Sequence, residues 1–230
     1  MPGDFKIEDK IKCLLWCDRH CCLCGKSCGT NIEIAHISPR KGKNSNNIDN
    51  AIPLCYDCHA KIGHYNKEHP RGNKYKEAEL KARRDQIYEK YTASLVPPIN
   101  YRISQLINPF DPRETRKRQF PDITFSIVNL SDYLSAKAKI IIKGILDSKP
   151  FNLNLTDRLY SDGKIWHLNP RNQINGHFMI YNNKIKELKQ GQRFEIRIAI
   201  TLIDIYEREH KRLEDGYVYM PESNNWYFEP

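Results

Sequence analysis

The stretch Asn50-Ala51-Ile52-Pro53-Leu54-Cys55-Tyr56-Asp57-Cys58-His59 decides what the front of this chain can form. Its Cys-x-x-Cys pair is matched by an earlier one, Cys21-Cys22-Leu23-Cys24. A Cys-x-x-Cys turn presents two thiolates from one loop, and two such turns supply the four soft ligands of a tetrahedral zinc site. Such a site is closed, so its zinc is expected to be structural and to drive folding. The predicted ligands are Cys21, Cys24, Cys55 and Cys58.

All eight cysteines lie in the first 58 residues. A disulfide scaffold would spread its bridges along a secreted chain, whereas clustered Cys-x-x-Cys pairs without a signal sequence indicate metal binding. Two alternatives stay open within the cluster, because Cys22 could replace Cys21 and Cys28 could replace Cys24. The cysteines expected to be packing residues are Cys13 and Cys17.

The 230 residues carry a formal net charge of +9, and the excess is uneven. Residues 1–95 hold 17 Lys and Arg against 12 Asp and Glu, whereas residues 121–230 hold 15 against 14. A basic front half suits a polyanionic partner, because neutralising phosphates drives nucleic-acid affinity. Ordinary solubility charge is the alternative. The charge therefore favours a polyanion such as a nucleic acid as the partner.

The chain contains no run of about 18 apolar residues, so no membrane span is expected. Its N-terminus, residues 1–12, is polar and charged and lacks the apolar core of a secretory signal. The sequence therefore predicts a cytoplasmic protein without a membrane partner.

Hydrophobic periodicity predicts the elements around the cysteine motifs. Residues 5–20 are expected to be helical, and short strands are expected at 31–37 and 51–54. A helix should begin near Cys58, and residues 75–91 have the pattern of an amphipathic helix. Residues 1–95 are thus predicted to form one zinc-stabilised domain.

The back half has a different character. Residues 96–119 contain several prolines and a basic run, and we expect them to form a linker. From Phe120 apolar residues alternate, and the longest stripe is Phe194-Ile196-Ile198-Ile200-Leu202. About seven short strands separated by Asn, Asp and Gly indicate a mainly antiparallel β-sandwich over residues 120–230. The predicted fold class is α+β, with an accessory domain that regulates, targets or oligomerises the protein.

The ordered motifs resemble the HNH endonuclease family over residues 12–91. The matching features are the first Cys-x-x-Cys, a strand that ends in His36, a polar loop, Asn50, and the second Cys-x-x-Cys followed by His59. The resemblance implies a ββα-metal finger, in which a hairpin and a helix hold one divalent cation over a scissile phosphate.

The resemblance also implies roles for single residues. His36 would be the general base, because an imidazole can accept a proton from water near neutral pH. His59 would bind a second, catalytic cation, which is expected to be Mg²⁺, Mn²⁺ or another transition metal. Asn50 would hold the loop so that His36 points correctly. The expected cofactors are therefore a structural zinc and a catalytic divalent metal.

Many family members carry an acidic residue or a histidine just before the base, as a metal ligand, where this chain has Ala35. We expect the replacement ligand to be His64, five residues after His59. Asp49 and Asp57 are weaker alternatives. The residues expected to follow the phosphate backbone are Arg40, Lys41, Lys43, Arg71, Lys74, Arg83 and Arg84.

The sequence thus predicts a metal-dependent HNH endonuclease that hydrolyses DNA, in a restriction or phage-defence setting by analogy. The β-domain would contact a regulatory protein or a second copy of the chain. Ala35 motivates the rival hypothesis, a zinc-folded nucleic-acid-binding module that has no catalytic activity and is controlled by its β-sandwich.

Overall fold

The computed structural model divides the chain into two compact units. One unit comprises Met1–Leu95 with Tyr206–Arg208, and the other comprises Val96–Ile205 and Glu209–Pro230. The structure describes residues 4–38, 46–63, 75–106, 120–151, 154–156, 165–181 and 192–229.

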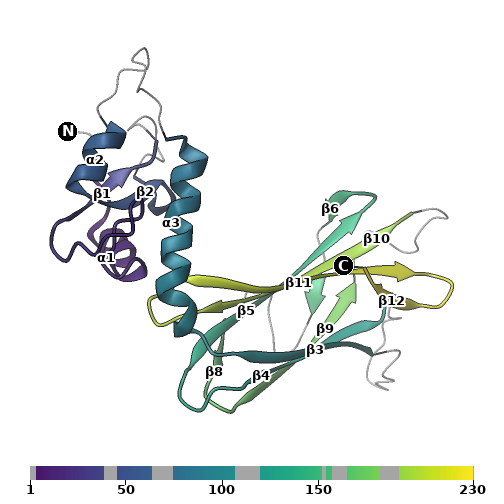
Figure 1. Cartoon of the computed structure of the whole chain (residues 1–230). Coiled ribbons are helices and arrows are strands. Elements are labelled where there is room, and N and C mark those ends of the chain that lie inside the picture. The colour runs from purple at the N-terminus through teal and green to yellow at the C-terminus, as the bar shows by residue number, and fades with distance from the viewer. Residues whose placement is uncertain are drawn as a thin grey trace. The chain divides into compact units, whose positions relative to one another are not determined.

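The first unit combines helices with a single two-stranded sheet (Figure 1). Its elements are α1 (Ile7–Trp16), β1 (Ile32–His36), the 3₁₀ turn η1 (Ile48–Asn50), β2 (Ala51–Cys55), α2 (Tyr56–Gly63), α3 (Glu77–Thr92) and the 3₁₀ turn η2 (Ala93–Leu95). The order of helices and strands agrees with the sequence prediction.

Strands β1 and β2 form an antiparallel hairpin. Its register places Ile32 opposite Cys55 and His36 opposite Ala51. Every residue of β2 is buried, whereas β1 is buried only in part. Because α2 begins directly after β2, the second Cys-x-x-Cys spans the junction between strand and helix.

The core of this unit lies between the hairpin and the helices. Cys17 after α1, Leu54 of β2, and Leu80 and Tyr88 of α3 belong to one buried cluster. The indole of Trp16 packs edge-on against Tyr88, with 5.4 Å between ring centroids. These contacts tie α1 and α3 to the strand that leads into α2.

The second unit is built from strands that pair antiparallel. They are β3 (Ile99–Leu106), β4 (Asp122–Asn129), β5 (Ala136–Leu146), β6 (Lys149–Phe151), β7 (Asn154–Thr156), β8 (Ile165–Leu168), β9 (Gln173–Tyr181), β10 (Phe194–Ile203), β11 (Glu209–Met220) and β12 (Asn225–Phe228). A six-stranded sheet has the order β12-β11-β10-β5-β6, with β8 also paired to β5, and a four-stranded sheet has the order β3-β4-β9-β7.

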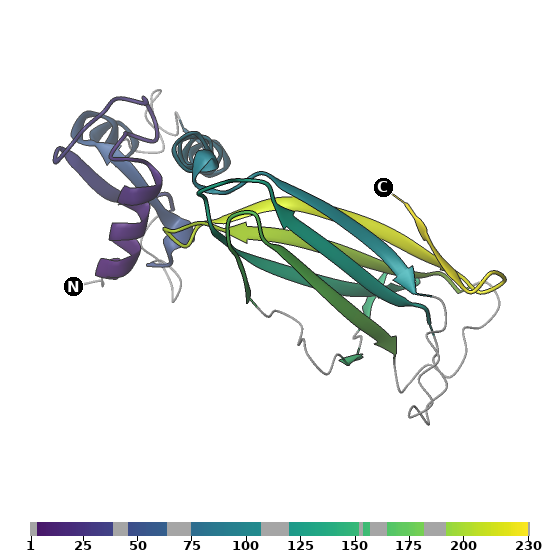
Figure 2. The ribbon, with the colours of Figure 1, turned by 90° about the horizontal axis from the view of Figure 1, so that it is seen from below.

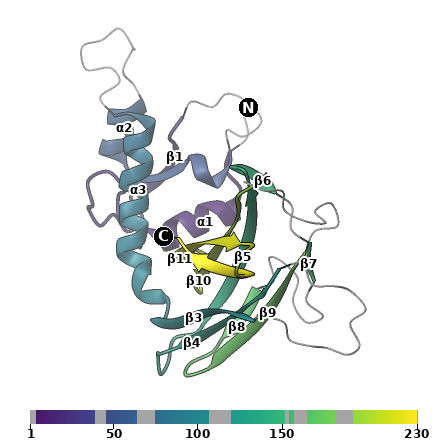
Figure 3. The same ribbon diagram turned by 90° about the vertical axis from the view of Figure 1, so that its right-hand side faces the viewer.

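The two sheets share one hydrophobic core and form a sandwich (Figure 2, Figure 3). Strand β10 alternates buried and half-buried residues, as its period-2 apolar stripe predicts. Its Phe194 packs against Phe120 with ring centroids 4.8 Å apart. The inward side chains of β10 meet Phe125 and Ile127 of β4 in the same cluster.

The structure corrects the sequence prediction in two places. Residues 99–106, expected within the linker, form strand β3, which pairs with β4 along its whole length. The described part of the sandwich also contains more strands than the seven expected, because short strands such as β6 and β7 pair with the edges of longer ones. The mainly antiparallel α+β class itself is confirmed.

Two histidines of the sandwich are paired with aspartates. His210 is buried and its Nε2 lies 2.9 Å from the buried Asp204 carboxylate. His177 lies 2.7 Å from the carboxylate of Asp122, which is almost completely buried. Both histidines are therefore engaged by a nearby carboxylate of the same unit.

Candidate metal centre and active site

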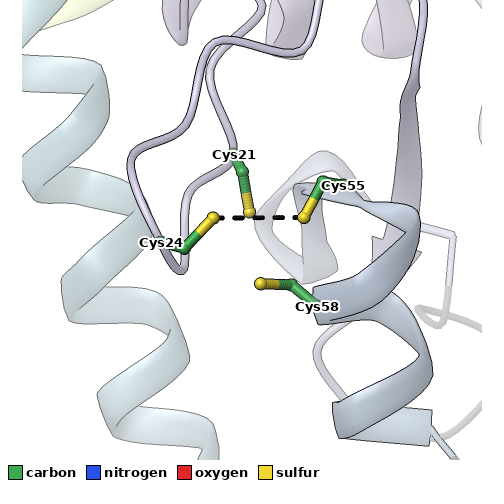
Figure 4. Close-up of side chains that lie close together, drawn as sticks. All are labelled: Cys21, Cys24, Cys55 and Cys58. Carbon is green, nitrogen blue, oxygen red and sulfur yellow. Dashed lines mark hydrogen bonds between the residues drawn. The ribbon is translucent and has the colours of Figure 1, made fainter.

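Four cysteine sulfurs converge in the first unit (Figure 4). The ligand atoms of Cys21, Cys24, Cys55 and Cys58 all lie within 4.8 Å of one another. The sulfurs of Cys24 and Cys55 are 4.0 Å apart, and Cys24 is the one exposed member. Among the residues that the structure describes, this is the one group of three or more candidate metal ligands.

Backbone hydrogen bonds shape the first Cys-x-x-Cys turn, called the first knuckle here. The amide of Gly25 donates to the Cys21 carbonyl at 2.8 Å, and Gly25 has a φ of 73°, which a glycine adopts without strain. The amide of Cys22 donates to the carbonyl of Pro53 at 2.9 Å. This bond ties the knuckle to β2, so that the two cysteine pairs face each other.

The geometry fits a zinc ion. Zinc–sulfur bonds are about 2.3 Å long, so sulfurs at the corners of a tetrahedron lie about 3.8 Å apart. The Cys24–Cys55 sulfur distance of 4.0 Å is close to that value, and every other pair lies within 4.8 Å. Burial, together with the neighbouring sulfur of Cys55, raises the pKa of the Cys58 thiol. A dication would offset the cost of placing thiolates together.

The remaining cysteines lie outside the cluster. Cys13, Cys17 and Cys22 are almost completely buried among apolar side chains, and burial raises the pKa of Cys13 to about 11. The Cys28 sulfur contacts the Lys26 carbonyl at 3.1 Å. The grouping thus favours Cys21 over Cys22 and Cys24 over Cys28, the alternatives that the sequence left open.

His36 stands at the end of β1, where two contacts orient its ring. The ring stacks on Phe5, with centroids 4.2 Å apart and an interplanar angle of 24°. Its Nε2 lies 3.1 Å from Oδ1 of Asn46. An amide oxygen accepts hydrogen bonds, so in the neutral ring this contact favours a proton on Nε2 and a lone pair on Nδ1. That atom has the electronic character of a base.

Asn50 ties the chain that follows His36 to the start of β2. Its Oδ1 accepts from the Ser38 amide at 2.8 Å, and its Nδ2 donates to the Ser38 carbonyl at 3.3 Å. The Asn50 carbonyl also accepts from the Ile37 amide at 2.8 Å. Asn50 therefore links the backbone after His36 to the backbone at the start of β2, which is the geometry that a loop-holding role requires. We call this set of hydrogen bonds the Asn50 bracket.

Arg84 of α3 also binds the backbone around Asn50. Its Nη1 donates to the carbonyls of Asp49 at 2.8 Å and Ala51 at 3.3 Å, the two neighbours of Asn50. Its side chain is only 11% exposed, and it also pairs with Asp85. Arg84 thus fastens the hairpin to α3, whereas the adjacent Arg83 is exposed and pairs with Glu79.

His59 lies in the first turn of α2, immediately after the last cysteine. Its Nδ1 is 2.6 Å from Oε2 of Glu33 on β1. Asp57 beside it is exposed. The register of the hairpin sets Glu33 opposite Leu54, near the cysteine end, whereas His36 lies at the other end. No contact between His36 and His59 occurs among the described interactions.

Several predicted site residues lie outside the described residues. They are His64, Arg40, Lys41, Lys43, Arg71 and Lys74.

Sequence reasoning missed three supporting residues. Phe5 stacks on His36, Oδ1 of Asn46 lies at hydrogen-bond distance from Nε2 of His36, and Glu33 contacts His59. Only Glu33 carried a usable signal, because it is two residues before Ala35 and so projects from the same face of the strand. Phe5 is 31 residues away from His36 in the sequence, so no local pattern could connect the two.

One of the three comparisons with known proteins matches a family model. Residues 21–64 match the family model described as HNH endonuclease, which confirms the resemblance seen in the motifs. The comparison with curated proteins gave no match. Among solved structures, the crystal structure of a FixG-related protein from Vibrio parahaemolyticus is similar at 12% identity and a TM-score of 0.28. It covers 53% of this chain and 95% of its own, and the likeness is too weak to indicate a function.

The first unit therefore contains an HNH region with a four-cysteine cluster that is compatible with structural zinc. The second unit is a β-rich sandwich. No helix in the described parts of the chain combines the length and apolar character that a membrane crossing needs.

Proposed function

We propose that this protein is a metal-dependent HNH endonuclease that hydrolyses DNA phosphodiester bonds. The observation that carries the proposal is the set of contacts that orients His36 within residues 21–64, which match the HNH family model. Asn46 lies at hydrogen-bond distance from Nε2, and Asn50 ties down the backbone that follows the ring. An imidazole that its surroundings hold in position is suited to proton transfer.

In the proposed reaction, Nδ1 of His36 accepts a proton from a water molecule. The water oxygen then attacks phosphorus, and the bond to the leaving sugar oxygen breaks. A divalent cation, when bound, supplies charge relief on the phosphate and the leaving oxygen. Phe5 covers one face of the imidazole, which limits its rotation and keeps Nδ1 directed.

The described residues offer a partial ligand set for that cation. His59, whose side chain is 41% exposed, provides an imidazole ligand, and Glu33 contacts the Nδ1 atom of the same ring. His64, outside the described residues, is the further ligand that we propose. An imidazole donor set favours a transition metal such as Mn²⁺, whereas carboxylate oxygens also suit Mg²⁺.

We propose that basic side chains of the first unit contact the DNA backbone. Arg83 is exposed on α3 and its pair with Glu79 is a surface pair, which a phosphate can displace. Arg84 is engaged by backbone carbonyls, which supports a role in holding the hairpin. The basic residues outside the described part, such as Arg40 and Lys41, remain proposed phosphate contacts.

The test is plasmid cleavage by the full chain with Mg²⁺, Mn²⁺, Ni²⁺ or Co²⁺. His36→Ala is expected to lower the cleavage rate by about 10²–10⁴-fold, the usual contribution of a general base. His167→Ala is the matched control, because His167 is exposed on β8 in the second unit. Equal cleavage by His36→Ala and the unaltered protein would remove His36 as the base.

The second candidate is a zinc-folded nucleic-acid-binding module without catalysis. Its motivating observation is Ala35, which is only 2% exposed and offers no ligand atom at a position where many HNH proteins have one. Sequence-independent DNA binding, one zinc per chain and no cleavage with any of the four cations would favour it.

We propose that the protein acts in restriction or phage defence in the cytoplasm, with the β-sandwich as a regulatory, targeting or oligomerising unit. The sandwich carries exposed aromatic side chains such as Tyr133 and Phe228. Light scattering of the purified protein, alone and with DNA, distinguishes a monomer from a homodimer.

A further inference from the structure

The pair formed by Glu33 and His59 joins strand β1 to helix α2. Glu33 is on β1 and His59 is in α2, 26 residues further along the chain, and their side chains meet at 2.6 Å. The two side chains are 46% and 41% exposed, so the pair borders solvent, where a cation and a phosphate can reach it. No sequence motif singled out Glu33.

The pair determines which nitrogen of His59 is protonated. A carboxylate accepts hydrogen bonds, so Nδ1 of the neutral ring must donate its proton to Oε2 of Glu33. The lone pair then resides on Nε2, the nitrogen on the other side of the ring. A carboxylate behind a metal-binding imidazole fixes its tautomer and orientation and raises its basicity.

Both members of this pair lie next to the cysteine cluster. Glu33 is paired with Leu54, the residue before Cys55, and His59 follows Cys58. Both partners are therefore one residue away from the four-sulfur cluster in sequence or in strand register. Zinc at that cluster would hold the spacing between Glu33 and His59, since the same ligands fix β2 and the start of α2.

The alternation of side chains along β1 determines the face on which the Glu33 carboxylate lies. Residues two apart on a strand share a face, so Glu33 lies on the face of Ala35. Ala35 has no polar atom, and its methyl group is buried in the apolar core. Glu33 is therefore the acidic group that this face of the strand contributes to the region of His59.

We propose that Glu33 is a positioning residue that holds His59 as the Nδ1–H tautomer and so presents Nε2 to the catalytic cation. The inference rests on the proposed nuclease function and adds to it a residue and an atom. With this role for Glu33, His59 stays oriented as a metal ligand even though Ala35, the residue before His36, offers no ligand atom.

The first test reads the tautomer directly. Long-range proton–nitrogen NMR of the zinc-loaded full chain at about pH 8, where an ordinary histidine is neutral, assigns the proton of His59 without any added catalytic metal. The expected result is Nδ1–H in the unaltered protein and a loss of that preference in Glu33→Ala. A His59 ring that carries its proton on Nε2 in the unaltered protein would overturn the inference.

The second test reads the metal. Mn²⁺ affinity, followed by electron paramagnetic resonance, is expected to fall about 10–100-fold in Glu33→Ala, the range seen when a partner behind a ligand is removed. Glu77→Gln is the control, because it removes one negative charge from an exposed site on α3. It should change neither the tautomer nor the affinity, and zinc content should stay the same in every variant.

The outcomes separate this inference from the function on which it rests. A protein that cuts DNA and binds Mn²⁺ equally well with and without Glu33 would overturn the positioning role and leave the nuclease proposal intact. A protein that neither binds Mn²⁺ nor cuts DNA would overturn the nuclease proposal, and the role of Glu33 toward a cation with it.

Discussion

At the residue scale, the candidate base is held by a chain of side chains and not by its own position alone. Arg84 binds the carbonyls on both sides of Asn50, Asn50 binds Ser38, and Ser38 follows His36 by two residues. Each link is an ordinary hydrogen bond, but together they connect α3 to the imidazole. Removing a hydrogen bond costs more free energy than the bond's net contribution when a buried carbonyl is left without a donor.

Arg84→Ala is therefore expected to destabilise the first unit by about 1–3 kcal/mol, because the Ala51 carbonyl loses a donor in a buried setting. Thermal unfolding of the zinc-loaded protein measures the change. Cleavage should also slow, since the Asn50 bracket loosens.

Its neighbour Arg83 supplies the control for this prediction. The Arg83 pair with Glu79 is an exposed i,i+4 pair, worth about 0.3–0.5 kcal/mol. Arg83→Ala should leave the unfolding temperature nearly unchanged and weaken DNA binding in a salt-dependent way. Similar losses of stability in both variants would contradict the structural role that we assign to Arg84.

At the element scale, a cross-strand contact stabilises the smaller sheet of the sandwich. Strand β9 places Gly176 directly opposite Phe125 of β4. The ring of Phe125 occupies the space above the glycine, and a Cβ added at Gly176 would lie 2.0 Å from the nearest ring atom. Glycine is thus required here for the close approach of an aromatic ring.

Gly176→Ala is expected to destabilise the sandwich by about 1–3 kcal/mol, the usual cost of overpacking, because Phe125 must leave its position against Trp166 and Phe178. Denaturant unfolding followed by near-ultraviolet circular dichroism measures it. Asn175→Ala on the exposed face of the same strand should stay within about 0.5 kcal/mol. An unchanged midpoint for Gly176→Ala would show that the ring has room to move.

At the scale of the whole molecule, the two units have different sources of stability. The second unit has a large apolar core with contributions from both sheets. The first unit has a smaller core in which cysteines take the place of larger apolar side chains. A structural zinc contributes about 10–16 kcal/mol in small zinc domains, which is comparable to the total stability of a domain of about 5–15 kcal/mol.

Zinc removal by a chelator is therefore expected to unfold the first unit and leave the sandwich folded. Hydrogen exchange should show rapid exchange in β1, β2 and α2 and unchanged protection in β5 and β10. Cys24→Ser should reproduce the effect and lower the zinc content, whereas Cys28→Ser should retain one zinc per chain. Persistent protection of β2 without zinc would show that the cluster is dispensable for folding.

The elements of the fold followed from the sequence because their signals are local. The two Cys-x-x-Cys pairs predict a four-sulfur site, and the alternation in β10 indicates a strand that is buried on one face. Strand β3 escaped prediction because its residues are only partly buried and lack a strict apolar period. Its identity as a strand depends on pairing with β4, which no local pattern specifies.

The sequence by itself determined the two cysteine motifs, the hairpin with its following helix, and His36, Asn50 and His59 as the residues to examine. It left the choices between Cys21 and Cys22 and between Cys24 and Cys28 to the structure. Only the tertiary structure decided the contacts that orient them: Phe5 on His36, Arg84 on the Asn50 segment and Glu33 on His59. The physical reason is distance along the chain. Spacing and periodicity report on neighbours within a turn or strand, whereas these contacts join residues more than 20 positions apart and exist only once the helices pack on the hairpin.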